Sequence, residues 1–203
     1  MPPTLATLLD PGPAPAPLVV TPAHVGGPVA WADLRRCGAL VELHEGVAVG
    51  AGTAVGPPHR ALALVGELPP RCVLAAATAA WVLTGLHDGD VARTWPPDAP
   101  VEAAYSPGTH CPPPRPGRVV RRAPGLAADT VRLAGVPVTN PTRTAADVAR
   151  TVPHDVAVVA LVALARRVAD LAGAARALDR RARVVGRPAA HRALAAAREL
   201  LGS

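Results

Sequence analysis

The sequence predicts an α+β protein: an N-terminal winged helix-turn-helix followed by a mixed α/β domain with a helical C-terminal end. Half of the 203 residues are apolar, which is enough to build a core. A short helix, a turn, a second helix and a two-stranded hairpin follow one another before residue 52, and that is the order of a winged helix-turn-helix. We therefore expect two units, residues 1–56 with a proline-rich N-terminal arm and residues 57–203.

The elements of the first unit follow from local signals. Thr21 caps a single helical turn over 22–25, because Pro22 suits the first helical position. A glycine turn leads into a helix over 29–37, which ends at Gly38. Two β-like runs at 39–43 and 47–51 form the hairpin.

In the second unit the pattern changes to longer helices and alternating strands. A helix over 59–68, a short strand over 72–74 and a buried helix over 76–83 come first. Further strands are expected over 101–105, 118–122, 131–133 and 136–139, the last two joined by the hairpin turn Ala134-Gly135. The remaining chain is helical, with helices at about 142–151, 154–168, 171–179 and 188–201.

Positive charge is concentrated in the second half of the chain. All 21 basic residues are arginine, and the net charge is +6. Up to Tyr105 there are 5 Arg against 9 acidic residues, a net charge of −4, and beyond it 16 Arg against 6 acidic residues, a net charge of +10. Nucleic acid or an acidic protein is therefore the expected partner class.

Several protein classes do not fit the sequence. The first basic residue is Arg35, so the start of the chain lacks the charged region of a secretory signal. The most apolar run, 156–165, is shorter than the roughly 20 residues of a membrane helix. Cys37, Cys72 and Cys111 fit neither a disulfide framework nor a zinc site. With no catalytic motif either, we predict a cytoplasmic, non-enzymatic protein without cofactor or metal.

Four segments in this order carry a resemblance to a known family: VELHEGVAVGAG, PPHRALALVGEL, CVLAAATAAWVLTGL and GVPVTNPTRTAADVART. They resemble the AbiEi-type abortive-infection antitoxins, in particular actinobacterial members without the C-terminal nuclease-like domain. The resemblance covers roughly Thr21 to Leu178. It implies an antitoxin of a type IV toxin–antitoxin system that binds promoter DNA, represses its own operon and acts indirectly on a nucleotidyltransferase-like toxin. The absence of lysine argues against a restriction-type nuclease.

If the first unit reads double-stranded promoter DNA, three residues are the candidates. Arg35 and Arg36 lie on the second helix and would reach guanine edges or phosphates, and His44 at the hairpin would touch the backbone. The alternative is that the two arginines form a solvated helix face. Residues 1–56 hold two arginines against four acidic residues, which is unusual for a DNA-reading domain.

A second set of arginines suits phosphate or an acidic partner surface, because guanidinium groups bind both. Its members are Arg118, Arg121 and Arg122 on one strand and Arg180, Arg181 and Arg183 near the C-terminus. They support the alternative function, a protein-interaction module that does not bind DNA and holds an acidic partner through its arginine-rich half.

The segment around Arg143 predicts a helix start. Thr144 and Asp147 have the spacing of a capping box, with Asp in place of the usual Glu or Gln. Arg143 itself either faces a partner or forms a buried pair with Asp147.

Overall fold

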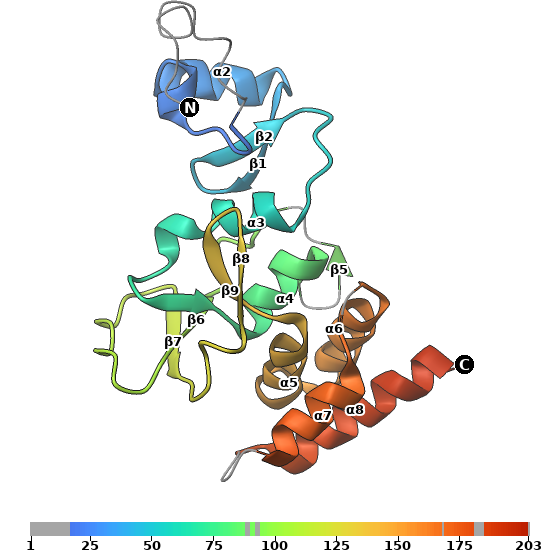
Figure 1. Cartoon of the computed structure of the whole chain (residues 1–203). Coiled ribbons are helices and arrows are strands. Elements are labelled where there is room, and N and C mark those ends of the chain that lie inside the picture. The colour runs from blue at the N-terminus through green and yellow to red at the C-terminus, as the bar shows by residue number, and fades with distance from the viewer. Residues whose placement is uncertain (1–16, 88–89, 92–93, 168, 181–184, 203) are drawn as a thin grey trace, which may run out of the picture.

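The fold is mixed α+β, as predicted. The computed structural model describes residues 17–87, 90–91, 94–167, 169–180 and 185–202. Figure 1 shows three tiers along the molecule: a helix and a hairpin near the N-terminus, a sheet with two helices in the middle, and a group of helices at the C-terminal end.

The N-terminal tier has the predicted order of elements. A 3-10 turn, η1 (Pro22–Val25), precedes the helix α2 (Pro28–Arg36), and the strands β1 (Leu40–His44) and β2 (Val47–Gly50) pair antiparallel. Gly38 has a φ of +74°, a left-handed conformation that favours glycine and ends the helix. Trp31 of α2 is buried.

The hairpin packs on the helix α3 (Pro57–Ala63), where Leu43 and Val49 share a buried cluster with Ala63. The sequence predicted one helix over 59–68. Instead α3 ends at Ala63, and a separate 3-10 turn, η2 (Val65–Glu67), follows. Gly66 is a poor helix former at this point, which explains why the α-helix does not continue.

A five-stranded sheet forms the middle tier, in the order β7-β6-β3-β9-β8. Its strands are β3 (Cys72–Leu74), β6 (Val101–Tyr105), β7 (Arg118–Arg122), β8 (Thr130–Leu133) and β9 (Val136–Thr139). Strand β6 runs parallel to β7, while the β8–β9 pair is the predicted hairpin. A short ribbon of β4 (Leu86–His87) and β5 (Asp90–Val91) follows α4 (Ala76–Thr84), which is almost wholly buried.

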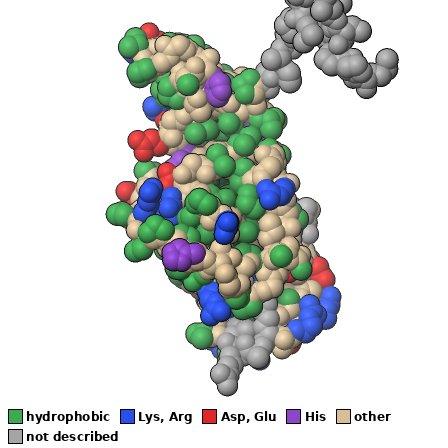
Figure 2. Space-filling view, turned by 60° about the vertical axis from the view of Figure 1, so that its left-hand side comes forward, with side chains coloured by type: hydrophobic (Ala, Val, Ile, Leu, Met, Phe, Trp, Pro, Cys, Tyr) green, Lys and Arg blue, Asp and Glu red, His purple; other side chains and the backbone are tan. Residues whose placement is uncertain are grey.

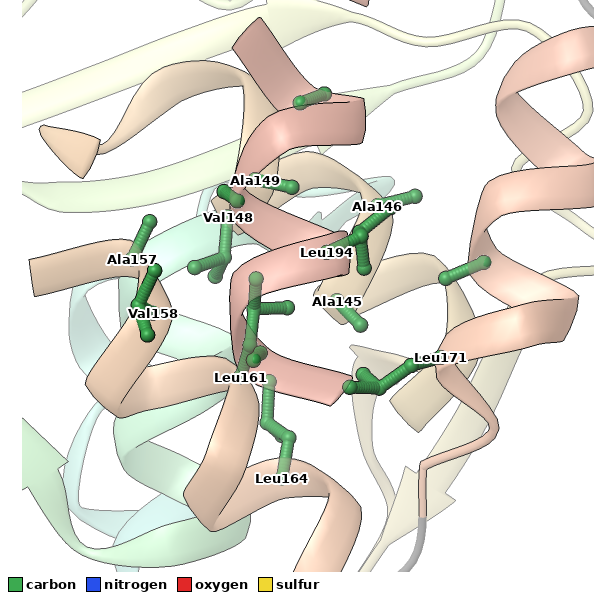
Figure 3. Packing of buried hydrophobic residues seen from close by; sticks show 14 of the residues in the cluster. Ala145, Ala146, Val148, Ala149, Ala157, Val158, Leu161, Leu164, Leu171 and Leu194 are labelled. Carbon is green, nitrogen blue, oxygen red and sulfur yellow. The ribbon is translucent and has the colours of Figure 1, made fainter. Parts of the chain in front are cut away.

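The four predicted C-terminal helices are present. They are α5 (Pro141–Thr151), α6 (His154–Arg167), α7 (Leu171–Arg180) and α8 (Arg187–Gly202). In Figure 3, Ala145 and Val148 of α5 lie among Leu161 and Leu164 of α6 and Leu194 of α8, all fully buried or nearly so. In the described part of the chain, no helix is long and apolar enough to cross a membrane.

The start of α5 differs from the capping box that the sequence predicted. Asn140 is the cap, since its Oδ1 accepts a hydrogen bond of 2.8 Å from the backbone amide of Arg143. The hydroxyl of Thr144 instead lies 2.7 Å from that of Thr139. The helix begins at Pro141 because proline suits the first helical position and asparagine suits the cap before it.

Candidate functional site

The two arginines expected to read DNA lie in the last turn of α2, and each is paired with an acidic residue. Arg35 Nη2 lies 2.7 Å from Glu42 Oε2 on β1, and Arg36 Nη1 lies 2.8 Å from Asp33 Oδ1 on α2 itself. Their side chains remain 48% and 75% exposed. The local carboxylates therefore offset much of the positive charge that these arginines bring to the surface.

His44, the third candidate of the first unit, points toward the second unit. Its Nε2 is 4.0 Å from Glu67 Oε1 of η2, and only 17% of its side chain is exposed. Arg118 Nη2 approaches the other oxygen of the same carboxylate at 3.5 Å. The side chains of His44 and Arg118 thus both lie beside the carboxylate of Glu67.

The three arginines of β7 have different surroundings. The side chain of Arg118 is 9% exposed, whereas Arg121 forms an ion pair with Glu102 of β6 and stays 44% exposed. Arg122 is exposed and forms no ion pair with any residue in the part of the chain that the structure describes. Figure 2, which brings the β7 side forward, shows arginine side chains as separate groups among apolar ones, not as one continuous patch.

Arg143 is the centre of a buried ion-pair cluster. Its Nε donates to Asp147 Oδ2 at 2.7 Å, and its Nη1 donates to Asp129 Oδ2 at 2.8 Å and to the carbonyl of Pro124 at 3.3 Å. Burial acts to lower the pKa of Arg143, but Asp147 and Asp129 outweigh it and hold that pKa above its ordinary value. Of the two interpretations of Arg143, the buried pair with Asp147 is confirmed.

A cavity of about 620 Å³ lies beside this cluster, between the end of β7 and one face of α5. Its charged lining consists of Arg121, Arg122, Arg143, Asp147 and Arg150. Sequence reasoning missed this cavity because its walls come from segments that are far apart in the chain. No periodicity signals such a meeting of a strand end and a helix face.

The C-terminal arginines are only partly described. Arg180 ends α7 and is exposed, with no ion pair to any other described residue, whereas Arg181 and Arg183 lie outside the described residues. Among the described residues nearby, Arg176 forms an ion pair with Asp170 at 3.0 Å, and His191 Nε2 lies 2.9 Å from Asp179 Oδ1. Within the ranges that the structure describes, no group of three or more His, Cys, Asp or Glu side chains is placed to hold a metal ion.

The chain thus has an α+β fold with a helix–hairpin unit near its N-terminus and a cavity lined by arginine side chains beside α5. The comparison with protein families is more specific. A family model described as the AbiEi antitoxin C-terminal domain matches residues 70–203, well over half of the chain. The chain belongs to the AbiEi-type antitoxin family, the antitoxins of toxin–antitoxin systems. A search of curated proteins finds no match.

Proposed function

We propose that this protein is an antitoxin-like transcriptional regulator of a type IV toxin–antitoxin system, which binds its promoter in the cytoplasm and represses its own operon without enzymatic activity. Residues 1–56 would be the DNA-binding unit, a winged helix-turn-helix, and residues 57–203 the antitoxin unit. Membership of the antitoxin family supports the second assignment. The observation that supports DNA binding by residues 1–56 is a pair of exposed or half-exposed arginines, Arg35 and Arg36, on the last turn of α2 next to the hairpin.

The acidic partners of these arginines give the proposal a specific mechanism. A DNA phosphate that binds Arg35 must either displace Glu42 from this arginine or share the arginine with it. A phosphate that binds Arg36 must compete with Asp33 in the same way. Both carboxylates also repel the phosphates directly. We therefore expect modest affinity, which rises when the carboxylates lose their charge.

The test is binding of the full chain to a duplex from upstream of its own gene, measured by fluorescence anisotropy at two salt concentrations. Glu42→Gln with Asp33→Asn should tighten binding. Arg35→Ala with Arg36→Ala should weaken it and reduce the slope of log K against log salt by about 2, close to one for each phosphate contact.

Arg166→Ala, on α6 at the far end of the molecule, is the control and should bind like the wild type. The DNA-binding proposal fails if the wild type binds no duplex at low salt. It also fails if neither pair of substitutions changes the affinity.

The alternative function, an interaction module for an acidic partner, is favoured by exposed arginines without ion pairs among the described residues, Arg122 and Arg180. An acidic toxin surface is the partner class. Co-expression with the product of the neighbouring gene tests it. A complex that survives nuclease treatment and is lost when Arg180, Arg181 and Arg183 become Glu would support this function, whereas the same complex in that variant would contradict it.

A further inference from the structure

We propose that the cavity between β7 and α5 binds a small organic phosphate, of which a nucleotide is the representative class. This site is separate from the DNA contacts proposed for α2 and does not depend on them. Its volume of about 620 Å³ lies within the roughly 300–1,000 Å³ of cavities that hold small ligands. The cavity can therefore enclose a molecule of nucleotide size.

The helix α5 presents an ordered row of charges to the cavity. Arg143, Asp147 and Arg150 are separated by four and three residues, so that they lie along one face of the helix. Arg143 and Asp147 are bonded to each other, and Asp129 holds Arg143 from a different segment. This part of the wall is thus fixed before any ligand arrives, which favours binding.

Of the four arginines in the lining, Arg122 and Arg150 are the two that can still bind a ligand. Arg121 is engaged by Glu102, and Arg143 by its two carboxylates. Arg122, in contrast, has no ion pair with any described residue, and Arg150 reaches Asp147 only at 3.9 Å. The Nε of Arg150 is also buried, and no hydrogen-bond partner for it is found among the residues that the structure describes.

The chemistry of these two arginines selects the ligand class. Guanidinium groups bind phosphate oxygens through two parallel hydrogen bonds, and a phosphate that carries more than one negative charge suits two of them. One arginine ends β7 and the other lies on α5, so the phosphate would bridge the two walls of the cavity.

Another part of the lining is small and apolar, which leaves room for the organic part of the ligand. It includes Ala75, Ala76, Ala103 and Ala104. Ala76 has a φ of +48°, a left-handed conformation that is unfavourable for alanine. Strained backbone of this kind tends to collect at binding sites, where the surrounding structure holds it in place.

Isothermal titration calorimetry on the full chain tests the proposal with three probes: ATP, inorganic pyrophosphate and adenosine. We expect ATP and pyrophosphate to bind and adenosine not to bind, because the phosphate carries the recognition. Arg122→Gln and Arg150→Gln should each weaken ATP binding about tenfold, and the double variant should abolish it. Circular dichroism and the melting temperature verify that each variant is folded.

Arg166→Gln is the matched control, a cation outside the cavity whose loss should leave ATP binding unchanged. The proposal is overturned if neither ATP nor pyrophosphate binds the wild type, or if the folded double variant binds ATP as the wild type does. Displacement of ATP by a DNA duplex with the same arginine dependence would also overturn it, because the cavity would then be a nucleic-acid site. Arg35→Ala with Arg36→Ala must keep ATP binding, which separates this test from the promoter experiment.

Discussion

Replacing Arg143 by methionine removes the central cation of the buried ion-pair cluster while keeping most of its side-chain volume. In the wild type, Arg143 is 5% exposed and donates to Asp147, Asp129 and the carbonyl of Pro124. After the substitution the Asp147 side chain, itself 9% exposed, keeps a single ion-pair partner among the described residues, Arg150 at 3.9 Å. A buried carboxylate is then left nearly without compensation.

The magnitude follows from that loss. Removing one partner of a buried ion pair destabilises a protein by about 3–5 kcal/mol, since the remaining charge stays desolvated. Asp129 is 28% exposed and can regain water, so it adds little. We expect Arg143→Met to lower the free energy of unfolding by about 3 kcal/mol or more.

Urea unfolding followed by circular dichroism at 222 nm measures the change. Arg36→Met is the matched control, because both side chains of the Arg36–Asp33 pair are mostly exposed, at 75% and 59%, and such pairs contribute about 1 kcal/mol or less. Arg143→Met combined with Asp147→Leu removes both charges and should recover much of the lost stability. A loss below about 1 kcal/mol in Arg143→Met, or no recovery in the double variant, would refute the reasoning.

Three further predictions concern local geometry. Asn140→Ala removes the cap of α5 and should cost about 1 kcal/mol in urea unfolding, whereas Asn140→Asp should cost less, because aspartate also caps. Ala134 has a φ of +47°, a conformation that favours glycine, so Ala134→Gly should raise the melting temperature. A lower melting temperature in this variant would contradict the inference that the backbone at Ala134 is strained. The Gly173 amide and Arg176 hold the pKa of Asp170 below its ordinary value. The stability from these two interactions is therefore present above pH 4 and lost as pH falls through the lowered pKa. Thermal unfolding between pH 6 and 3 should show a shallower pH dependence in Asp170→Asn than in the wild type.

Elements with local signals were predictable from the sequence. The strands over 101–105 and 118–122 have the predicted bounds, because alternating residues between turn signals define a strand locally. The four C-terminal helices are found within a residue or so of their predicted ends, because helical periodicity and the residues that end a helix are also local signals. The partner of each strand was not predictable. That β6 and β7 run parallel depends on the long connection over 106–117, whose length permits parallel pairing without requiring it.

The candidate site was less predictable, because its contacts join distant segments. The pairing of Arg35 with Glu42 depends on how the hairpin folds back against α2, and the meeting of His44 and Arg118 at Glu67 depends on how the two units pack. The local i to i+4 spacing of Arg143 and Asp147 did indicate a pair, but Asp129 completes the cluster from another segment. Contacts of this kind follow from tertiary packing rather than from a sequence period.

The number of arginines overstates the positive charge that a partner can reach, because some of these arginines are buried and hydrogen-bonded within the protein. Arg60 is 6% exposed and donates to the carbonyls of Val82 and Val55. Burial, and the charge of Arg167 to a smaller extent, lowers the pKa of Arg60 to about 10, so this cation remains charged at neutral pH but unavailable to a partner. Arg143 is used in the same way between its carboxylates. A net charge of +10 beyond Tyr105 therefore does not by itself predict a DNA-binding surface, and the exposed arginines without ion pairs are the ones that substitution must test.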